Sequence, residues 1–593
     1  MDINQRIDAL RKKMKEYGID AYVVVTGDYH QSEYVGDHFK AREFLTGFTG
    51  SAGTCIVTQK RAGLWTDGRY FIQARMQLQG SEIDFFPMGE PGVADIYQYL
   101  EEIVPMGACI GFDGKCVGNF QGEKFLEIAK AKGGKVAFST DLLDTIWEDR
   151  PALSKNRAFL LEETYSGKSA KDKLTLIRQA MIEKGADAYL LSSLDDIGWL
   201  LNIRGRDVKY CPLLLSYLFM TKDGTELYAD AEKLDEKIKA YLEDAKVSVF
   251  PYEDIFQRVK KLDSKSSICF DPASTSFYLA HSLPKGIKKI EEINPTLLEK
   301  AVKNPVEIEN IKRAHIKDGI AMVKFLYWIK NHSMENLSEL SASAKLEAFR
   351  GEQEGFIEPS FAPICAYKEH AAIVHYSADE ESNCPLKKSG LFLTDTGGHY
   401  LEGSTDITRT IVMGDLSKEE RFSFTLVLIA MLRLMNTKFL YGCTGTNLDL
   451  AAREVFWKHG LDYKHGTGHG VGYLGNIHEG PQAFRWKILK GDLPLQAGMV
   501  ITDEPGLYIE GAYGIRIENE LLVVEEKKNA YGQFMGFEPL TYVPIDKEGI
   551  DLHIMTKEDK VYLNAYHAMV FEKLSPYLGG DELVWLKEAT SPL

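Results

Sequence analysis

The sequence predicts two related α/β domains followed by a larger mixed α+β domain. Three observations support this prediction: a helix–glycine–strand unit that occurs twice, a long helical pattern that begins just after residue 300, and a change beyond it to short strands between glycine-rich turns. We place the three domains at residues 1–153, 154–300 and 301–593. A chain of 593 residues is long enough to give each domain a core of its own.

The repeat is visible between residues 10–24 and residues 177–191. These segments read LRKKMKEYGIDAYVV and IRQAMIEKGADAYLL. An offset of 167 residues aligns Arg11 with Arg178, Met14 with Met181, Gly18 with Gly185, Asp20 with Asp187 and Tyr22 with Tyr189. Each copy combines an amphipathic helix, a glycine that ends it and an apolar strand. The identities in register favour a duplicated domain over the chance recurrence of a common α/β pattern.

The third domain begins with a predicted helix over residues 307–330, because Pro305 suits the first turn of a helix and apolar residues follow at helical spacing. Beyond this helix we predict strands at residues 389–394, 404–413, 499–502 and 514–524. Capping boxes at 417–420 and 446–449 predict the starts of helices over 422–435 and 450–458.

Charge and cysteine content exclude several classes of function. With 70 Lys and Arg against 86 Asp and Glu, the net charge of −16 argues against a general binder of nucleic acid or of an anionic membrane. The 8 cysteines include no CxxC pair, which favours reduced thiols over a zinc ribbon or a redox motif. The apolar helix at 422–435 is shorter than the roughly 20 residues that span a bilayer. We therefore expect a cytoplasmic protein without nucleic-acid or membrane partners.

Histidines concentrate in the third domain, where seven of 14 lie between residues 370 and 478. Within this region a formal GxGxxG occurs at 470–475, but no helix follows it, so dinucleotide binding has little support. Chemistry-bearing residues are instead expected among the histidines and the acidic residues beside them.

Two aspartates are placed to meet across a hairpin. Asp395 ends an apolar run and Asp406 follows eleven residues later, with glycines at 397, 398 and 403 between them. A hairpin turn there would bring both carboxylates onto neighbouring strands. Taken singly, each aspartate also suits a turn or a strand end.

Two glutamates and one histidine complete a candidate metal site. Glu504 and Glu518 lie at strand positions, where burying an unpaired charge is costly, and His469 lies in a glycine-rich loop. Glu518 could instead pair with Arg516 or face solvent, and a single histidine is often structural. Together the five residues are a hard donor set that favours Mn²⁺ or a similar ion, and four carboxylates are better balanced by two ions than by one.

These motifs resemble the pita-bread metallopeptidases, a family that includes methionine aminopeptidase, prolidase and Xaa-Pro aminopeptidase. The whole chain is most similar to the three-domain cytosolic Xaa-Pro aminopeptidases (aminopeptidase P). The resemblance rests on the five candidate ligands and on the segments 30–33, 46–54, 65–71, 373–376 and 476–481. It implies a pita-bread fold for the third domain.

The resemblance also implies a role for each site residue. Asp395 would bind one metal, His469 and Glu504 the other, and Asp406 and Glu518 would bridge both. A bridging water or hydroxide would attack the scissile carbonyl, with Glu504 as the proton shuttle. The residues implied to contact or line the substrate site are His375, His465, His478, Tyr508 and Arg516, with His375 and His478 stabilising the oxyanion and Arg516 orienting Glu518.

The implied substrates are peptides with proline second, from which the first residue is released by a homodimeric enzyme. Two alternatives stay open. A prolidase, which cleaves only dipeptides, shares the catalytic domain but usually has one N-terminal domain. A non-catalytic pita-bread binding module is the other alternative, although such proteins lack the full ligand set. A methionine aminopeptidase is disfavoured because that family lacks these N-terminal domains.

Overall fold

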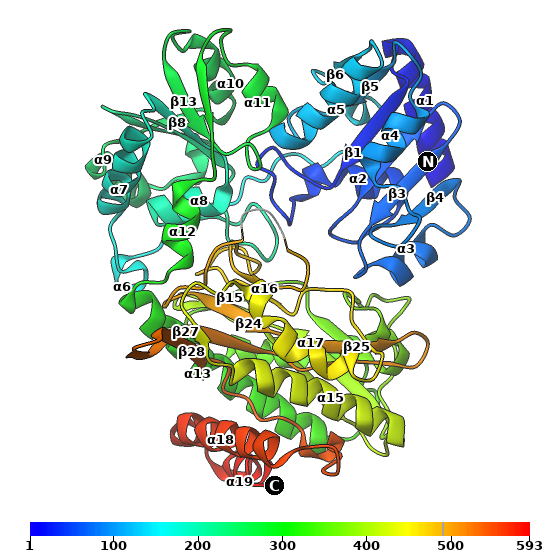
Figure 1. Ribbon diagram of the computed structural model, residues 1–593, viewed down its shortest axis with the longest axis vertical. Coiled ribbons are helices and arrows are strands. Elements are labelled where there is room, and N and C mark those ends of the chain that lie inside the picture. The colour runs from blue at the N-terminus through cyan, green and yellow to red at the C-terminus, as the bar shows by residue number, and fades with distance from the viewer. Residues whose placement is uncertain (489–491) are drawn as a thin grey trace. The chain divides into compact units, whose positions relative to one another are not determined.

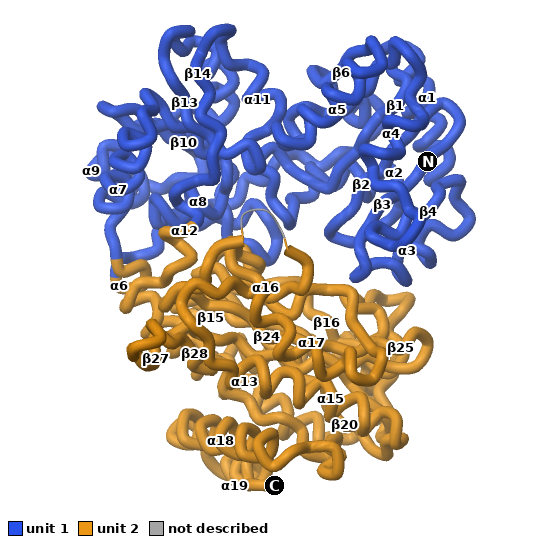
Figure 2. Tube along the Cα trace, viewed as in Figure 1, with its two compact units in different colours: residues 1–163, 168–297 blue, residues 164–167, 298–593 orange. Residues whose placement is uncertain are grey.

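The computed structural model describes residues 1–488 and 492–593, which form two compact units (Figures 1 and 2). Unit 1 comprises Met1–Glu163 and Lys168–Leu297, and unit 2 comprises Thr164–Gly167 and Leu298–Leu593. The division into three domains, with boundaries at residues 153 and 300, stays a prediction.

Unit 1 contains two six-stranded mixed sheets with the same topology. The first has the order β4-β3-β2-β1-β5-β6 and the second β12-β11-β10-β8-β13-β14. Their strands are β1 Ala21–Val25, β2 Thr54–Thr58, β3 Ala62–Thr66, β4 Ile83–Pro87, β5 Cys109–Phe112 and β6 Lys135–Ala137, then β8 Ala188–Leu191, β10 Ser216–Thr221, β11 Thr225–Ala229, β12 Val247–Phe250, β13 Ser267–Phe270 and β14 Lys288–Glu291. In both sheets the central strand has one antiparallel and one parallel neighbour. The predicted duplication is confirmed.

Helices cover both sheets. Around the first lie α1 Ile3–Tyr17, α2 Ala41–Thr46, α3 Phe71–Gln77, α4 Ile96–Ile103 and α5 Asn119–Ala131, and around the second α7 Ala170–Glu183, α8 Leu194–Leu201, α9 Glu236–Asp244, α10 Ile255–Arg258 and α11 Phe277–His281. Gly18 ends α1 at φ 64°, and Gly185 follows α7 at φ 69°. Glycine suits both positions because other residues rarely adopt a positive φ.

Asp20 and Asp187, which occupy the same position in the two copies, make the same kind of contact, and this explains part of the sequence identity between the copies. The Asp20 carboxylate accepts a hydrogen bond from the Cys109 backbone N at 2.8 Å, at the start of β5. In the second copy, Asp187 accepts from the Ser267 backbone N at 3.0 Å, at the start of β13. Each aspartate thus fixes where the central strand meets its parallel neighbour.

Unit 2 is built from antiparallel strands with helices packed against them. Its principal sheets have the orders β16-β17-β20, β15-β18-β19 and β21-β28-β27-β24, and β22–β23 and β25–β26 form two smaller pairs. The strands are β15 Phe356–Pro359, β16 Ile364–Tyr367, β17 Leu391–Thr396, β18 Gly398–Tyr400, β19 Gly403–Ser404, β20 Ile407–Val412, β21 Phe439–Leu440, β22 Gly468–His469, β23 Ala483–Phe484, β24 Val500–Asp503, β25 Gly506–Ile509, β26 Tyr513–Arg516, β27 Asn519–Asn529 and β28 Gly532–Pro539.

The long helices of unit 2 bury their apolar faces on these strands. They are α13 Pro305–Asn331, α14 Glu339–Gly351, α15 Lys418–Met435, α17 Leu450–Trp457, α18 Lys557–Leu574 and α19 Gly580–Ala589. α15 supplies much of the main core cluster, together with residues of β24 and β27. Within the described ranges, no helix is long and apolar enough to cross a membrane.

Most of the predicted elements of the third domain are present. The helix predicted at 307–330 is α13, with Asn304 in a capping box and Pro305 at its first position. The capping box at Ser417 is confirmed at the start of α15. The predicted hairpin is confirmed as well, because β17 and β20 are antiparallel neighbours.

Two local predictions are wrong. The strand predicted at 514–524 is two strands, because β26 pairs with β25 whereas β27 pairs with β24 and β28. The capping box predicted at 446–449 is displaced: Thr444 caps the short helix α16 (Gly445–Leu448), and the Asp449 carboxylate binds Arg453 instead.

Candidate metal centre

The five predicted ligands come from the ends of five strands of unit 2. Asp395 lies in β17, Asp406 directly precedes β20, and His469 ends β22. Glu504 follows β24, and Glu518 occupies the break between β26 and β27. The break that the sequence did not predict is therefore the position of a candidate ligand.

Backbone contacts hold these strand ends together. The Glu504 N donates to Thr467 O at 2.8 Å, and the Glu518 N donates to Thr408 O at 3.1 Å. A Cβ atom on Gly468 would lie 1.9 Å from Thr502 O, so only glycine allows β22 to approach β24 this closely. The imidazole of His469 is thereby brought to the end of β24, where Glu504 lies.

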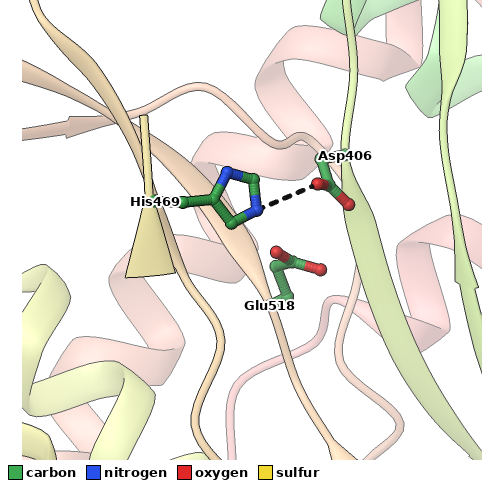
Figure 3. Close-up of side chains that lie close together, drawn as sticks. All are labelled: Asp406, His469 and Glu518. Carbon is green, nitrogen blue, oxygen red and sulfur yellow. Dashed lines mark ion pairs between the residues drawn. The ribbon is translucent and has the colours of Figure 1, made fainter. Parts of the chain in front are cut away.

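Three of the predicted ligands form a compact donor cluster (Figure 3). One ligand atom each from Asp406, His469 and Glu518 lies within 4.8 Å of the others. The His469 Nε2 is 3.4 Å from Asp406 Oδ2 and 3.7 Å from Glu504 Oε1. Such spacing suits a cation between the donors better than it suits direct hydrogen bonds.

The ring of His469 is oriented as a metal ligand requires. Its Nδ1 lies 2.9 Å from the backbone O of Gly470, and since a carbonyl can only accept, Nδ1 carries the proton. In the neutral ring Nε2 then presents a lone pair to the carboxylates. A carbonyl acceptor behind the ring is the usual partner of a metal-bound histidine.

One carboxylate oxygen of Asp395 accepts a hydrogen bond, and the other is available to a metal ion. Its Oδ2 accepts from Arg516 Nη2 at 2.5 Å. Its Oδ1 is buried and has no hydrogen-bond partner among the described residues. A buried carboxylate oxygen without a donor is unfavourable unless a cation binds it, so this atom fits a metal ligand.

The carboxyl groups raise one another's pKa. Burial, and then the neighbouring charges of Asp395 and Glu504, hold the pKa of Asp406 well above its usual range. Burial and the charge of Asp406 do the same to the pKa of Glu518. Burial also raises the pKa of Glu504, although the nearby His469 and Arg516 lower it. Divalent cations would remove this repulsion, which supports a metal site.

The predicted substrate residues adjoin this cluster. A chain of hydrogen bonds runs from Arg516 Nη1 to the Tyr508 hydroxyl at 2.7 Å and from that hydroxyl to His465 Nε2 at 2.8 Å. The ring of His478 lies 4.2 Å from that of His469, centroid to centroid. Arg516 Nη2 lies 3.4 Å from the carbonyl O of Val374, which places the backbone next to His375 beside the cluster.

Some contacts differ from the prediction. Arg516 was expected to orient Glu518; it binds Asp395 directly, and it reaches Glu518 only through Thr408, because its Nε donates to the Thr408 hydroxyl at 3.2 Å. Glu518 is held instead by the Thr408 hydroxyl at 2.7 Å.

Sequence reasoning also missed Glu520, whose Oε1 accepts from the backbone N of Asp406 at 2.6 Å. Thr408 and Glu520 each lie two residues from a candidate ligand, and residues two apart in a strand share a face. That spacing was the signal that could have found them.

A cluster of carboxylates and one imidazole, with histidines on its rim, defines a metal-dependent hydrolase site. The comparisons agree. Residues 309–525 match the metallopeptidase family M24, and residues 533–593 match the C-terminal region of that family. Residues 6–145 and 149–307 each match the creatinase/prolidase N-terminal domain, which agrees with the duplication.

The chain belongs to the Xaa-Pro aminopeptidase family of M24 metallopeptidases, with two creatinase-type N-terminal domains and a pita-bread catalytic domain. It is 37% identical over 618 residues to "Probable Xaa-Pro aminopeptidase P" of Paracoccidioides brasiliensis (strain Pb03), with 100% of both chains covered. It is 36% identical to "Aminopeptidase P1" of Arabidopsis thaliana, covering 100% of this chain and 99% of that protein.

A solved structure is similar over the full length. The X-prolyl aminopeptidase from Caenorhabditis elegans is 33% identical to this chain and matches it with a TM-score of 0.96 over 100% of both chains. That protein is described as a cytosolic enzyme with a di-nuclear active site. The full-length match includes both N-terminal domains and the catalytic domain.

Proposed function

We propose that this chain is an aminopeptidase that hydrolyses the bond between the first residue of a peptide and a proline in second position. The observation that carries the proposal is the convergence of Asp406, His469 and Glu518 with Glu504 and Asp395 close by. Full-length similarity to Xaa-Pro aminopeptidases supports the choice of substrate.

Two divalent ions per subunit are the proposed cofactors, and the oxygen-rich donor set favours Mn²⁺. Asp395 would hold one ion, and His469 and Glu504 the other. Asp406 and Glu518 would bridge both. The ions would supply a water of lowered pKa and polarise the scissile carbonyl.

Glu504 is the proposed proton shuttle. Its side chain is 19% exposed, so it can reach a substrate, and a carboxylate can act as a general acid–base group. It would accept the proton of the attacking water and deliver it to the leaving proline nitrogen.

The histidines would act on the peptide itself. His375 and His478 would donate hydrogen bonds to the oxyanion that forms on the scissile carbonyl. His465 would line the proline side of the pocket, fixed there by the Tyr508 hydroxyl. Arg516 would hold both Tyr508 and Asp395, and so link the proline pocket to the ion site.

An X–Pro bond lacks an N–H, so a site selective for it must recognise the ring and the free N-terminal amine.

We further propose a homodimer that acts in the cytoplasm, without nucleic-acid or membrane partners. The C. elegans relative is described as cytosolic, which supports the location.

Release of the first residue from an Xaa-Pro-Yaa tripeptide and an Xaa-Pro dipeptide tests the proposal. The protein would be stripped of metal, then reloaded with Mn²⁺, and an Xaa-Ala-Yaa tripeptide would serve as the matched control. We expect metal-dependent cleavage of Xaa-Pro-Yaa and little cleavage of the control.

Other outcomes are equally informative. Cleavage of the dipeptide alone would identify a prolidase. If neither peptide is cleaved but two ions are bound, the substrate class is wrong. Failure to cleave and to bind metal would favour the non-catalytic binding module.

Replacing His469 with alanine should lower metal occupancy. The ring supplies a direct ligand, and because even its outer partners are worth about 10–100-fold in affinity, we expect binding of one ion to weaken at least about 100-fold. Elemental analysis of the dialysed protein measures this. His478→Ala is the matched control: it should keep its metal but lose turnover, and unchanged stoichiometry in His469→Ala would contradict the assignment.

A further inference from the structure

Glu339 is a fully buried acidic residue that the proposed chemistry does not use. It lies in the first turn of α14 and is 0% exposed. A buried carboxylate is costly unless hydrogen bonds and nearby positive charge compensate it. The helix N-terminus supplies part of that compensation. The rest comes from four donors: the backbone N atoms of Tyr367 and Cys384 at 2.7 and 3.0 Å, His370 Nδ1 at 2.9 Å and the Tyr376 hydroxyl at 3.0 Å.

All four donors belong to one segment, and they lie on both sides of His375. Tyr367 and His370 precede it, whereas Tyr376 and Cys384 follow it. The two carboxylate oxygens therefore tie the start and the end of the segment 367–384 to the same point. Burial and hydrogen bonding leave the carboxylate little freedom to move.

The opposite side of the segment packs against the strands of the metal centre. A Cβ atom on Gly514, in β26, would lie 1.8 Å from the carbonyl O of Ala371, so the two backbones are in direct contact. Arg516, in the same strand, approaches the carbonyl O of Val374 at 3.4 Å and also binds Asp395. The segment thus lies between Glu339 and the residues that hold the metal ligand Asp395.

We propose that Glu339 is a positioning residue, which clamps the segment 367–384 at both ends and so aims His375 at the scissile carbonyl. This inference rests on the proposed role of His375. Beyond its 3-10 helix, Lys368–Ala372, the segment contains no helix or strand of its own, so its backbone is otherwise free to shift. A displacement of about 1 Å at a reacting group can reduce a rate by about 100-fold.

The test compares kcat and KM of metal-loaded Glu339→Gln, His375→Asn and the double variant on an Xaa-Pro-Yaa tripeptide. Glutamine keeps the size of the side chain but loses the charge and one acceptor oxygen. For Glu339→Gln we expect kcat to fall about 10–100-fold with little change in KM. Metal stoichiometry should be unchanged, because none of the four donors is a proposed metal ligand.

The double variant distinguishes positioning from general stability. If Glu339 acts through His375, Glu339→Gln should cause little further loss in the His375→Asn background, whereas independent effects would multiply. Tyr376→Phe, which removes a single donor, provides a milder second variant. Glu369→Gln, an exposed acid in the same segment, is the matched control and should behave as wild type.

Three results would overturn the inference. Unchanged kcat in both Glu339→Gln and Tyr376→Phe would show that Glu339 does not position the segment, while leaving the role of His375 intact. Multiplying losses in the double variant would show that Glu339 acts elsewhere. If His375→Asn alone keeps the wild-type kcat, the proposed role of His375 fails, and the clamp has no catalytic target.

Discussion

Asp406→Asn should abolish metal-dependent turnover while the chain stays folded. The proposed role of Asp406 is to bridge two ions with its two oxygens, and an amide offers only one oxygen and no charge. We expect kcat/KM to fall at least about 1,000-fold, which corresponds to about 4 kcal/mol of transition-state stabilisation. The measurement is the rate of release of the first residue from Xaa-Pro-Yaa with Mn²⁺ in excess.

The fold should tolerate this change, because the site without metal is strained by its own charges. Burial and the charge of Asp395 already raise the pKa of Asp406, so a neutral side chain of the same shape relieves repulsion. Asp415→Asn, an exposed aspartate beyond the end of β20, is the matched control. Wild-type turnover in Asp406→Asn would refute the bridging role, and Glu518→Gln tests the same role from the other bridging residue.

The parts of this fold that the sequence predicted are those specified by local pattern. The helix–glycine–strand unit around Gly18 and Gly185 was visible because a glycine at positive φ commonly ends a helix. Pro305 and the Ser417 capping box marked helix starts for the same kind of local reason. The aspartate pair followed from the hairpin between β17 and β20.

The contacts that the sequence did not predict join residues far apart in the chain. Arg516 binds Asp395 directly, 121 residues away, and contacts its neighbour Glu518 only through the Thr408 hydroxyl. Glu339 lies 28 to 45 residues from its partners. Neither residue has a local pattern that indicates its partner, since the tertiary packing of the folded chain brings the partners together. The sequence could therefore identify candidate ligands but not what holds them.

Removing the metal should make the stability of this protein fall as the pH rises. Asp406, Glu504 and Glu518 have folded-state pKa values above their unfolded values near 4. A carboxyl with a raised pKa contributes stability that is fully present below the unfolded pKa and is lost as the pH rises through the folded pKa. Each pKa unit of elevation is worth about 1.4 kcal/mol.

Metal binding should reverse this dependence, because the ions displace protons from the three carboxyls and leave them ionised in the folded state. The difference in Tm between metal-loaded and metal-stripped protein should therefore grow from pH 5 to pH 8, by about 1.6 °C for each kcal/mol in a unit of the size of unit 2. Calorimetry of both forms across this range measures it. Asp406→Asn removes one of the three groups, so the stripped variant should lose less stability with rising pH than stripped wild type. Equal slopes for the two stripped proteins would mean that the repulsion among these carboxyls does not limit the stability of the metal-free fold.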